Sequence, residues 1–523
     1  MKKSAFFSFA LLLSLMQFGQ TTGVFSSGLT NGDQFQPTCG VRDNFDNVIC
    51  MGQSSTINGY KLYFAKINSW GNPDWSFVLD CNGSSTIGKL IQTSDNNFLA
   101  VTGDGGGGIV VKLTTSGSIL WVKKFSNIYV FHDVIEDVNG ELYFLGKGAI
   151  MPIVMKTNST ATVIWSQTFA FSPAPAAYFP ERMILTGDGN LAIAGCTSGS
   201  GGGMMLFKIS KLGVIVWGNI YRSTGVALTG SSLAQSSTDG SFMVTGTSRL
   251  GTYFDAAVFK IDNNGGVISS KVLSAVYHDY LYDVVETGVE GQFMVLGKTM
   301  LWSNCGGNLL FVKFDSNLDT LLTRSYGLIN GSSSWFTKFN RIPGAGYYTV
   351  GTGTLWSKHI PLFSMDNVVV KVDSNASGIC DPYQQTFTLS SLPLTTSGTI
   401  SSSTMTPTST TTYTQTNIAM NTINGCTGQP FGIEEGKTVF SLMAFPNPDK
   451  HGFKLKIEGL ETNQGLSLGI FDMQGRKVRS VDHLSLNSAN ETDLIGHECK
   501  PGIYLLIAEL QNGATVRIMH VVE

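Results

Sequence analysis

The most constraining feature of the sequence is a repeat built around a lysine in a short apolar run. In Ile109–Trp121 the run leads through Thr-Thr-Ser-Gly to Ile-Leu-Trp. This pattern predicts a strand, a tight turn and a second strand, with Gly117 supplying the positive φ of the turn. Seven copies recur at intervals of 44 to 58 residues. Their anchor residues are Lys66/Trp75, Lys112/Trp121, Lys156/Trp165, Lys208/Trp217, Lys260/Ser269, Lys313/Leu322 and Lys371/Cys380.

A second landmark keeps step with the first. An apolar run ending in Gly precedes each lysine, and a further apolar run lies upstream of a polar turn such as Asp188-Gly189-Asn190. Each period therefore contains four short strands, which is typical of a propeller blade, and single blades cannot bury their own faces. The sequence thus predicts an all-β chain with a seven-bladed β-propeller over residues 34–383. The four repeat tryptophans are expected to pack between blades.

The N-terminus has the features of an export signal. Residues 1–20 combine Lys2-Lys3 with an apolar run too short to span a bilayer, which predicts a secretory signal peptide. No other stretch is long enough for a transmembrane segment. Only 14% of the 523 residues are charged and the net charge is −3, so no basic face for nucleic acid is expected.

Eight cysteines accompany this exported chain. Cys39 and Cys50 flank a predicted hairpin and form one possible disulfide, and Cys380 with Cys426 forms a second. The alternative, buried small hydrophobes, fits Cys196 and Cys305 equally well. No Cys-x-x-Cys pair and no spaced carboxylate loop occurs, so no metal and no cofactor are predicted.

The chain changes character after the repeats. Residues 384–438 are rich in Ser and Thr and almost free of charge, which predicts a linker: an extended spacer, or at most an extra strand on the last blade. Residues 439–523 regain strand patterns and carry four motifs. The motif residues are Phe445, Pro446, Asn447, Pro448, Asp472, Gly475, Arg476, Pro501, Gly502 and Tyr504.

The order and spacing of these motifs resemble the type A C-terminal sorting domain of type IX secretion. The resemblance implies a small Ig-like sandwich with turns at Asp472–Gly475 and Pro501-Gly502. It also implies a Bacteroidetes-type source, passage through the periplasm, and recognition by the translocon and a surface sortase. The product would be secreted or attached to the outer surface of the outer membrane.

Candidate ligand-binding residues come from two places in the propeller. Alignment of the first strand of each repeat puts polar residues at nearly equivalent positions, where they would surround the propeller axis: Gln36, Lys89, Asp133, Arg182, Ser232, Asp283 and Lys338. They would either pair with one another or hold a polar or charged ligand. His132 and His278 lie close to the same rim.

Two further candidates lie in longer loops of the later blades. Trp302 and Trp356 each occur in the tripeptide Leu-Trp-Ser, outside the frame of the repeat tryptophans. Exposed aromatic side chains on neighbouring blades would stack on a sugar or a peptide. The alternative is that each ring covers its own loop.

Three function classes remain open. A binding or adhesion module for a glycan or protein ligand is favoured by the lone propeller and the loop tryptophans. An enzyme acting on a polysaccharide or peptide would need an acid and a base at the axis. The Lys-x4-Gly-x3-Trp unit is similar to repeats of quinoprotein dehydrogenases, but neither a vicinal Cys pair nor Cys-x-x-Cys-His occurs. A structural surface protein is the third class. Because no catalytic motif is found, no catalytic residue is assigned.

Overall fold

The computed structural model describes most of the repeat region and the strands that follow it. The described residues are 23–26, 34–56, 59–68, 73–80, 88–172, 174–199, 202–249, 251–275, 277–300, 308–326, 335–342, 344, 346–353, 366–377, 388–405, 409–410, 415–417, 421–424, 441–445, 453–458, 466–472, 477–481, 491–494, 502–510 and 515–522. They belong to two compact units, Met1–Gln429 and Pro430–Glu523. The predicted signal peptide, residues 1–20, lies outside the described residues.

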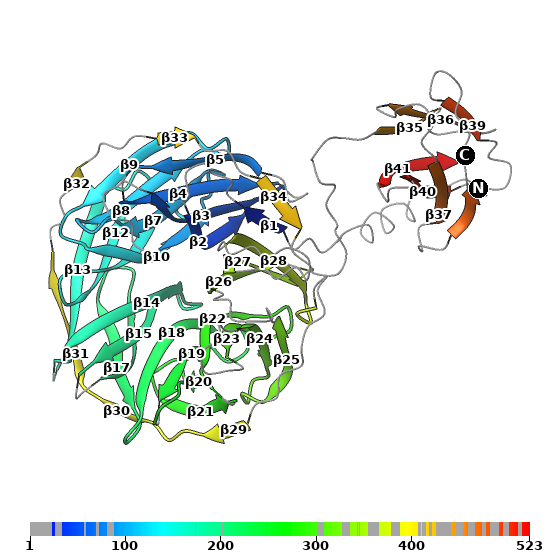
Figure 1. The fold of residues 1–523 in the computed structure, drawn as a ribbon. Coiled ribbons are helices and arrows are strands. Elements are labelled where there is room, and N and C mark those ends of the chain that lie inside the picture. Colours follow the sequence, from blue (N-terminus) through cyan, green and yellow to red (C-terminus); the bar gives the residue numbers. More distant parts are fainter. Residues whose placement is uncertain are drawn as a thin grey trace, which may run out of the picture. The chain divides into compact units, whose positions relative to one another are not determined.

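The first unit is a ring of seven antiparallel sheets arranged around an axis (Figure 1). The predicted all-β, seven-bladed propeller is therefore confirmed. The innermost strands, in the order of blades 1 to 7, are β2 (Gln34–Arg42), β6 (Lys89–Gln92), β10 (Val130–Glu136), β14 (Ala177–Leu185), β18 (Ala227–Gln235), β22 (Asp279–Glu286) and β26 (Trp335–Ile342).

Two further strands follow outward in every blade. The second strands are β3 (Val48–Thr56), β7 (Phe98–Gly103), β11 (Leu142–Lys147), β15 (Leu191–Ser198), β19 (Phe242–Arg249), β23 (Phe293–Thr299) and β27 (Gly346–Gly353). The third strands are β4 (Gly59–Ile67), β8 (Gly108–Leu113), β12 (Pro152–Thr157), β16 (Gly203–Ile209), β20 (Asp255–Ile261), β24 (Asn308–Phe314) and β28 (Asp366–Asp373).

The fourth strands carry the repeat tryptophans in blades 1 to 4. They are β5 (Pro73–Leu79), β9 (Ile119–Phe125), β13 (Val163–Ser172), β17 (Ile215–Arg222), β21 (Val267–Ser274) and β25 (Thr320–Tyr326) for blades 1 to 6. In blade 7 this place is taken by β1 (Gly23–Ser26), which pairs antiparallel with β28. The N-terminal strand thus closes the ring by completing the last blade.

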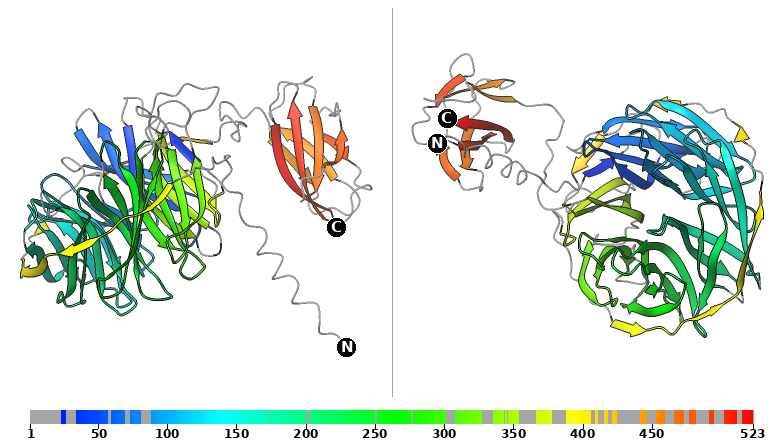
Figure 2. Two further views of the ribbon diagram at one scale, coloured as in Figure 1. Left: turned by 90° about the horizontal axis from the view of Figure 1, so that it is seen from below. Right: turned by 180° about the vertical axis from the view of Figure 1, so that it is seen from behind.

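A fifth strand is added to six blades by the Ser/Thr-rich tract. These strands, here called the peripheral segment, are β29 (Thr388–Ser391), β30 (Thr395–Ser397), β31 (Thr399–Thr404), β32 (Ser409–Thr410), β33 (Gln415–Asn417) and β34 (Asn421–Asn424). They pair with the outer strands of blades 5, 4, 3, 2, 1 and 7 in turn. The segment therefore runs around the circumference of the propeller (Figures 1 and 2). Its direction is opposite to the order in which the blades follow one another along the chain.

The tract predicted as a linker over residues 384–438 is extended in its described part. Its described strands pair with outer strands of the blades, as β31 does with β13. A Ser/Thr sequence cannot bury a core of its own, yet β-branched Thr suits a strand, and the outer edge of each blade offers unpaired backbone groups. Pairing at an edge needs no core, so composition alone did not reveal it.

The core of the propeller lies between blades. Seven buried hydrophobic clusters are found among the described residues, and each is shared by two neighbouring blades. Ile49 of blade 1 and Phe98 of blade 2, for example, both have 0% exposure and belong to one cluster. This division is the physical reason why one repeat cannot fold alone.

The repeat tryptophans connect the blades at the outer rim, as predicted. Trp75 Nε1 donates to the Thr115 carbonyl of blade 2 at 3.2 Å, and Trp217 Nε1 donates to the Asn263 carbonyl of blade 5 at 3.0 Å. The turn that Trp75 contacts requires glycine at position 117 for two reasons. Gly117 has a φ of +83°, and a Cβ at this position would lie 2.7 Å from the Trp75 indole.

Cys39 and Cys50 do not form the predicted disulfide. Cys39 pairs with Met51 and Cys50 with Gly40, so the two cysteines are offset by one residue across β2 and β3. An offset of one residue turns two side chains to opposite faces of a sheet. Cys39 is buried between blades 1 and 2, and Cys50 is buried between blades 7 and 1, both as free thiols. Cys380, Cys426 and Cys305 lie outside the described residues.

The second unit consists of two antiparallel sheets in its described part. One contains β35 (Ser441–Phe445), β36 (Phe453–Glu458) and β39 (Glu491–Leu494), and the other contains β37 (Leu466–Asp472), β38 (Lys477–Val481), β40 (Gly502–Leu510) and β41 (Thr515–Val522). Leu468, Ile470, Tyr504 and Leu506 are buried. Strands β37 and β38 flank the predicted turn at Asp472–Gly475, consistent with the sandwich that the resemblance implied.

Candidate functional site

A β-bulge at the same place in six innermost strands sets the geometry at the axis. In five of these strands one residue is inserted directly before the residue that faces the axis. In β26 the irregular stretch between Phe336 and Phe339 itself contains that residue, Lys338. Strand β6 puts Lys89 at the matching register. The residues at this position, here called the axial ring, are Cys39, Lys89, Asp133, Arg182, Ser232, Asp283 and Lys338.

Six of the seven axial residues were predicted, and one was not. In blade 1 the position belongs to Cys39, whereas Gln36 pairs with Gln53 three residues earlier in β2. Blade 1 has no polar residue at the ring position, so an alignment that looks for polar side chains selects Gln36 instead. Burial raises the pKa of the Cys39 thiol to about 12, which keeps it neutral.

Asp133 is fully buried, and its carboxylate contacts cations of the axial ring as well as backbone N–H groups. Its Oδ1 lies 2.5 Å from Lys89 Nζ, and its Oδ2 accepts a hydrogen bond from the Met183 N–H of the next blade at 2.9 Å. Burial opposes its ionisation, but attraction by Lys89, Arg182 and Lys338 outweighs this and lowers the pKa of Asp133 below its usual value. The carboxylate therefore ties blade 3 to blades 2 and 4.

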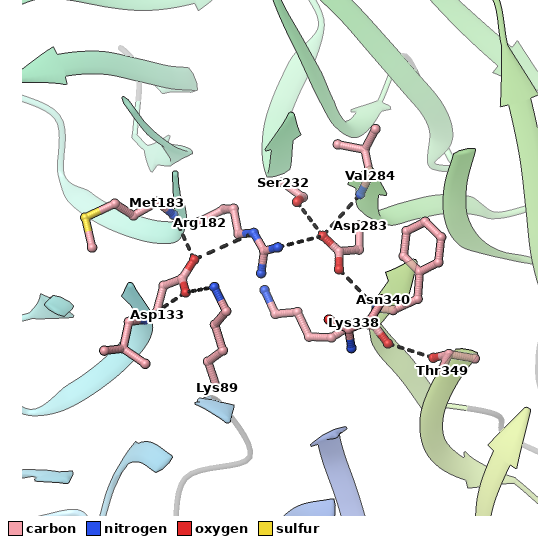
Figure 3. Close-up of polar contacts among 12 residues, drawn as sticks. Lys89, Asp133, Arg182, Met183, Ser232, Asp283, Val284, Lys338, Asn340 and Thr349 are labelled. Atoms are coloured by element: carbon pink, nitrogen blue, oxygen red, sulfur yellow. Dashed lines mark hydrogen bonds and ion pairs between the residues drawn. The ribbon is translucent and has the colours of Figure 1, made fainter. Parts of the chain in front are cut away.

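Asp283 of blade 6 connects its neighbouring blades in the same way. Its Oδ1 accepts from Ser232 Oγ at 2.5 Å and from the Val284 N–H at 3.1 Å, and its Oδ2 accepts from the Phe339 N–H of blade 7 at 3.0 Å. Both ring carboxylates are thus occupied by hydrogen bonds to backbone and side-chain donors (Figure 3).

The cations of the axial ring are only partly paired with carboxylates. Arg182 lies between the two carboxylates, with Nε 3.7 Å from Asp133 Oδ2 and Nη2 4.0 Å from Asp283 Oδ1. Lys338 makes no ion pair with any carboxylate in the described part of the chain. Figure 3 shows the ends of Lys89, Arg182 and Lys338 pointing toward one another. Three cations therefore converge beside two carboxylates that are already hydrogen-bonded.

Lys89 shows that this convergence has an electrostatic cost. Burial, followed by repulsion from Arg182, lowers the pKa of Lys89 to about 8 despite its pairing with Asp133. Repulsion from Lys338 acts in the same direction. An additional anion at this place would relieve the repulsion among all three cations.

A second layer of side chains comes from the bulges themselves. His132 Nδ1 of blade 3 lies 4.0 Å from Glu181 Oε2 of blade 4. Lys147 Nζ of β11 stands 4.2 Å above the Phe179 ring. Glu181 keeps 35% side-chain exposure, and desolvation raises its pKa to about 7, while Lys338 and Lys147 act in the opposite direction. Lys338 of blade 7 thus acts on Glu181 from across the axis.

His132 carries unused hydrogen-bonding capacity. Only 3% of it is exposed, and neither Nδ1 nor Nε2 has a hydrogen-bond partner among the described residues. Burial lowers the pKa of His132 to about 3, and repulsion from Lys338 and Lys147 adds to the effect. The imidazole of His132 is therefore neutral. Arg182 Nε is likewise buried without a hydrogen-bond partner. Buried polar atoms without a partner are uncommon in folded proteins, so His132 and Arg182 Nε are candidate contacts for a ligand.

The structure brings together the predicted residues Lys89, Asp133, Arg182, Asp283 and Lys338. The predicted Trp302 and Trp356 lie outside the described residues and remain a prediction. Sequence reasoning missed Glu181 and Lys147, because a bulge residue and a residue on the second strand share no motif with the ring. His278, expected near the same rim, lies instead among the aromatic side chains of blades 5 and 6.

The fold and the axial ring define the class: this is a β-propeller with a polar, mostly buried cluster at its axis. Residues 443–522 match the family model of the secretion system C-terminal sorting domain. The chain is therefore a propeller that carries a type IX sorting domain, which confirms the resemblance and implies export to the cell surface or the medium.

Solved structures with distant similarity to the chain include the following two. The streptogramin B lyase structure is 12% identical with a TM-score of 0.41, over 66% of this chain and 98% of that one. Drosophila plexin A, in complex with semaphorin 1b, is 8% identical with a TM-score of 0.35, over 68% and 88%. Similarities this weak carry no argument. No curated protein matches the chain.

The sorting motifs lie at strand ends wherever they are described. Phe445 ends β35, Asp472 ends β37, and Gly502 and Tyr504 lie at the start of β40. The remaining motif residues Pro446, Asn447, Pro448, Gly475, Arg476 and Pro501 lie outside the described residues. Among the described residues there is no helix with the length and apolarity needed to cross a bilayer.

Proposed function

We propose that this exported propeller is a binding protein that holds an anionic group of its ligand at the axis. The observation that carries the proposal is the convergence of Lys89, Arg182 and Lys338, of which Lys338 forms no ion pair in the described part of the chain. Small-molecule sites typically have a few convergent polar groups in an enclosed place. A carboxylate, sulfate or phosphate group is the ligand chemistry that fits.

The neighbouring groups support the same ligand class. Neutral His132 donates from one ring nitrogen, and Arg182 Nε is a further buried donor with no hydrogen-bond partner. The two ring carboxylates are outnumbered by the three cations, and both lie close to Lys89 or Arg182, which offsets their repulsion of an anion. Charge-assisted hydrogen bonds to such donors are stronger than neutral ones.

Calorimetric titration of the purified protein with inorganic sulfate and with succinate tests the proposal. Wild type is expected to bind at least one of them, with an affinity that falls as the salt concentration rises. Lys338→Met keeps the apolar stem and removes the charge, so we expect about tenfold weaker binding. Its thermal midpoint should stay the same or rise, since a cation among cations has been removed.

The matched control is Lys271→Met. Lys271 is a similarly accessible lysine on β21 at the outer rim, paired with Asp319 at 2.5 Å. Its replacement should leave anion binding unchanged. Equal binding by wild type and Lys338→Met, or no binding of either anion to wild type, would refute the axial site.

A second function, an enzyme with its site at the axis, is favoured by one observation. Glu181 has a pKa of about 7 and lies 4.0 Å from neutral His132, so near neutral pH it is able to donate a proton to a bound ligand. In that case Glu181→Gln would bind the ligand normally and fail to turn it over. If wild type binds the ligand without turning it over, the enzymatic function is excluded and the binding function stands.

A further inference from the structure

A continuous row of aromatic rings leads from the rim of blades 5 and 6 toward the axis. Tyr253 and His278 have ring centroids 5.2 Å apart, Phe254 and Tyr280 are 5.7 Å apart, and Tyr280 and Tyr282 are 6.0 Å apart with an interplanar angle of 6°. Tyr277 flanks Tyr253 at 5.5 Å. We call these six residues the aromatic row.

The row ends in the same layer as His132 and Glu181. Tyr282 is the bulge residue of β22, directly before Asp283 of the axial ring. His132 and Glu181 are the bulge residues of blades 3 and 4. Because equivalent residues of a propeller lie at equal depth along the axis, Tyr282 lies at the level of the proposed anion site. The other end is accessible, with Tyr253 40% exposed.

The composition of the row points to a ligand with both apolar faces and polar edges. Four of its six rings are Tyr and one is His, and the single Phe is covered by Arg249, whose Cζ lies 5.1 Å from the ring centroid. A surface for apolar peptide side chains would be lined by Leu, Ile, Met or Phe. Tyr and His instead combine a flat face with a hydrogen-bonding rim, which matches the C–H faces and hydroxyl edges of a sugar ring.

One ring of the row is held in a defined orientation. His278 Nδ1 accepts a hydrogen bond from the Phe254 N–H at 3.0 Å. In the neutral imidazole the proton is then on Nε2, which becomes a donor. A fixed donor within a stack of ring faces suits a hydroxyl or a carboxylate of a sugar.

Positive charge lies at both ends of the row. Lys338 and Arg182 lie at the axis, and Arg249 is exposed at the rim. The chain as a whole has a net charge of −3, so this distribution is a local feature. A ligand that follows the row from rim to axis would meet cations at both ends and aromatic faces between them. The carboxylates next to the row are Asp255 and the fully buried Asp279.

We infer that the ligand is an acidic oligosaccharide whose sugar rings lie along the aromatic row and whose innermost carboxylate reaches the axial cations. This inference rests on the proposed anion site and names the ligand class. It assigns stacking to Tyr253, Tyr277 and Tyr280 and charge recognition to Lys338 and Arg249.

The test compares three probes by calorimetric titration of the purified protein: tetragalacturonate, the neutral β-1,4-galactotetraose and tetraglutamate. Tetragalacturonate should bind about tenfold more tightly than either of the others. The variant Tyr253→Ala/Tyr277→Ala should lose about tenfold in affinity for tetragalacturonate and none for sulfate. Lys338→Met should weaken both.

The matched control for the aromatic row is Phe45→Ala, which removes an aromatic ring that is 80% exposed in a turn outside the row. It should change no affinity. The thermal midpoint of the double variant shows whether it is folded, and Tyr253→Ala alone replaces it if it is not. That single variant removes an exposed ring and should still weaken binding.

The outcomes separate the two proposals. Tight binding of tetraglutamate that is insensitive to the tyrosine changes would overturn the sugar and leave the anion site. Equal binding of the neutral tetrasaccharide would overturn the acidic ligand. If wild type binds neither sulfate nor tetragalacturonate, both proposals fail together. Loss of tetragalacturonate binding in the tyrosine variant, with sulfate binding intact, supports the inference.

Discussion

The outer rim and the axis of this propeller are built from the same seven repeats, yet they use the repeat in opposite ways. At the rim the same contact recurs: an indole on the fourth strand of one blade donates to a carbonyl in a turn of the next, as Trp75, Trp165 and Trp217 do. At the axis equivalent positions carry seven side chains of five types. The repeated tryptophan contact at the rim joins neighbouring blades. The different side chains at equivalent positions of the axis make its chemistry asymmetric.

The difference also concerns what holds each region together. The tryptophan contacts at the rim bury apolar surface and use neutral hydrogen bonds, so their contribution does not depend on charge. Ion pairs such as Lys271–Asp319 are separate contacts of the rim. Axial contacts use buried ions, and removing one member of such a set is costly because the partner stays buried and unpaired. The comparison therefore predicts that rim changes lower stability alone, whereas axial changes alter stability, pH dependence and binding together.

The largest effect is expected from removing the peripheral segment. A chain ending after Tyr383 loses four partly buried apolar side chains, Leu392, Leu394, Ile400 and Met405, which pack on three inter-blade clusters. At roughly 1.5 kcal/mol each, the loss is about 6 kcal/mol as an upper bound. Thermal unfolding should occur about 10 °C lower.

The matched truncation ends after Gln429, at the boundary between the two units. It removes the sorting domain and keeps the peripheral segment, so the propeller should unfold at the same temperature as in the full chain. That protein should also stay in the periplasm, because the sorting signal is lost. Equal midpoints for the two truncations would show that the peripheral segment contributes nothing to stability.

The second effect in size is expected at the axis. Asp133→Ala leaves Lys89 without its partner at 2.5 Å and the Met183 N–H without an acceptor. Truncating one member of a buried ion pair costs about 3–5 kcal/mol. Chemical denaturation of the variant measures this loss, and Asp74→Ala, at an exposed carboxylate near the rim, is the control. A loss below about 1 kcal/mol would mean that the axis is more hydrated than the contacts indicate.

How much of these two regions the sequence reveals follows from their construction. The rim was predictable because Lys, Gly and Trp recur at fixed spacing. The axial ring was predictable wherever a polar or charged residue marks it, as at Ser232 and Asp283, and the prediction failed at Cys39, where none does. The disulfide prediction failed because the hairpin turn pairs Arg42 with Val48, and this register leaves Cys39 and Cys50 offset by one. The peripheral segment was missed because its side chains are mostly exposed and its pairing is mainly through the backbone.

The aromatic row could not be found as a motif. Tyr253 and Phe254 belong to the turn between β19 and β20, whereas His278 and Tyr280 lie more than twenty residues further on, at the start of β22. The propeller brings a turn of one blade beside the first strand of the next. Only the three-dimensional arrangement therefore joins them.

A smaller effect is expected at the rim. Trp217→Ala removes the hydrogen bond to Asn263 and the contact with Phe242, whose ring centroid is 6.2 Å away. Because Trp217 is only partly buried, we expect a loss of about 2–3 kcal/mol, below that of a fully buried ring. Urea denaturation measures it. Leu212→Ala, at a side chain that is 73% exposed, is the control. Anion binding should be unchanged, and a weakened affinity would contradict the separation of rim and axis.

The smallest effect on stability, and the most informative about the axis, is expected from Glu181→Gln. Burial raises the pKa of Glu181 to about 7 from an ordinary value of 4.5. A carboxyl group whose pKa is raised in the folded state stabilises below its unfolded pKa and loses that contribution as the pH rises through the folded value. Wild type should therefore lose stability between pH 5 and 8 relative to Glu181→Gln.

The same titration should appear in anion binding. Below about pH 7 Glu181 is neutral and does not repel an anion held by Lys338, so sulfate should bind more tightly at pH 6 than at pH 8. Deprotonation of Lys89, with a pKa of about 8, weakens binding further at the alkaline end. Glu181→Gln should remove the transition near pH 7 and keep the one near pH 8. Affinities measured across this range for both proteins decide the matter, and a parallel pH dependence in the two would show that Glu181 does not face the anion.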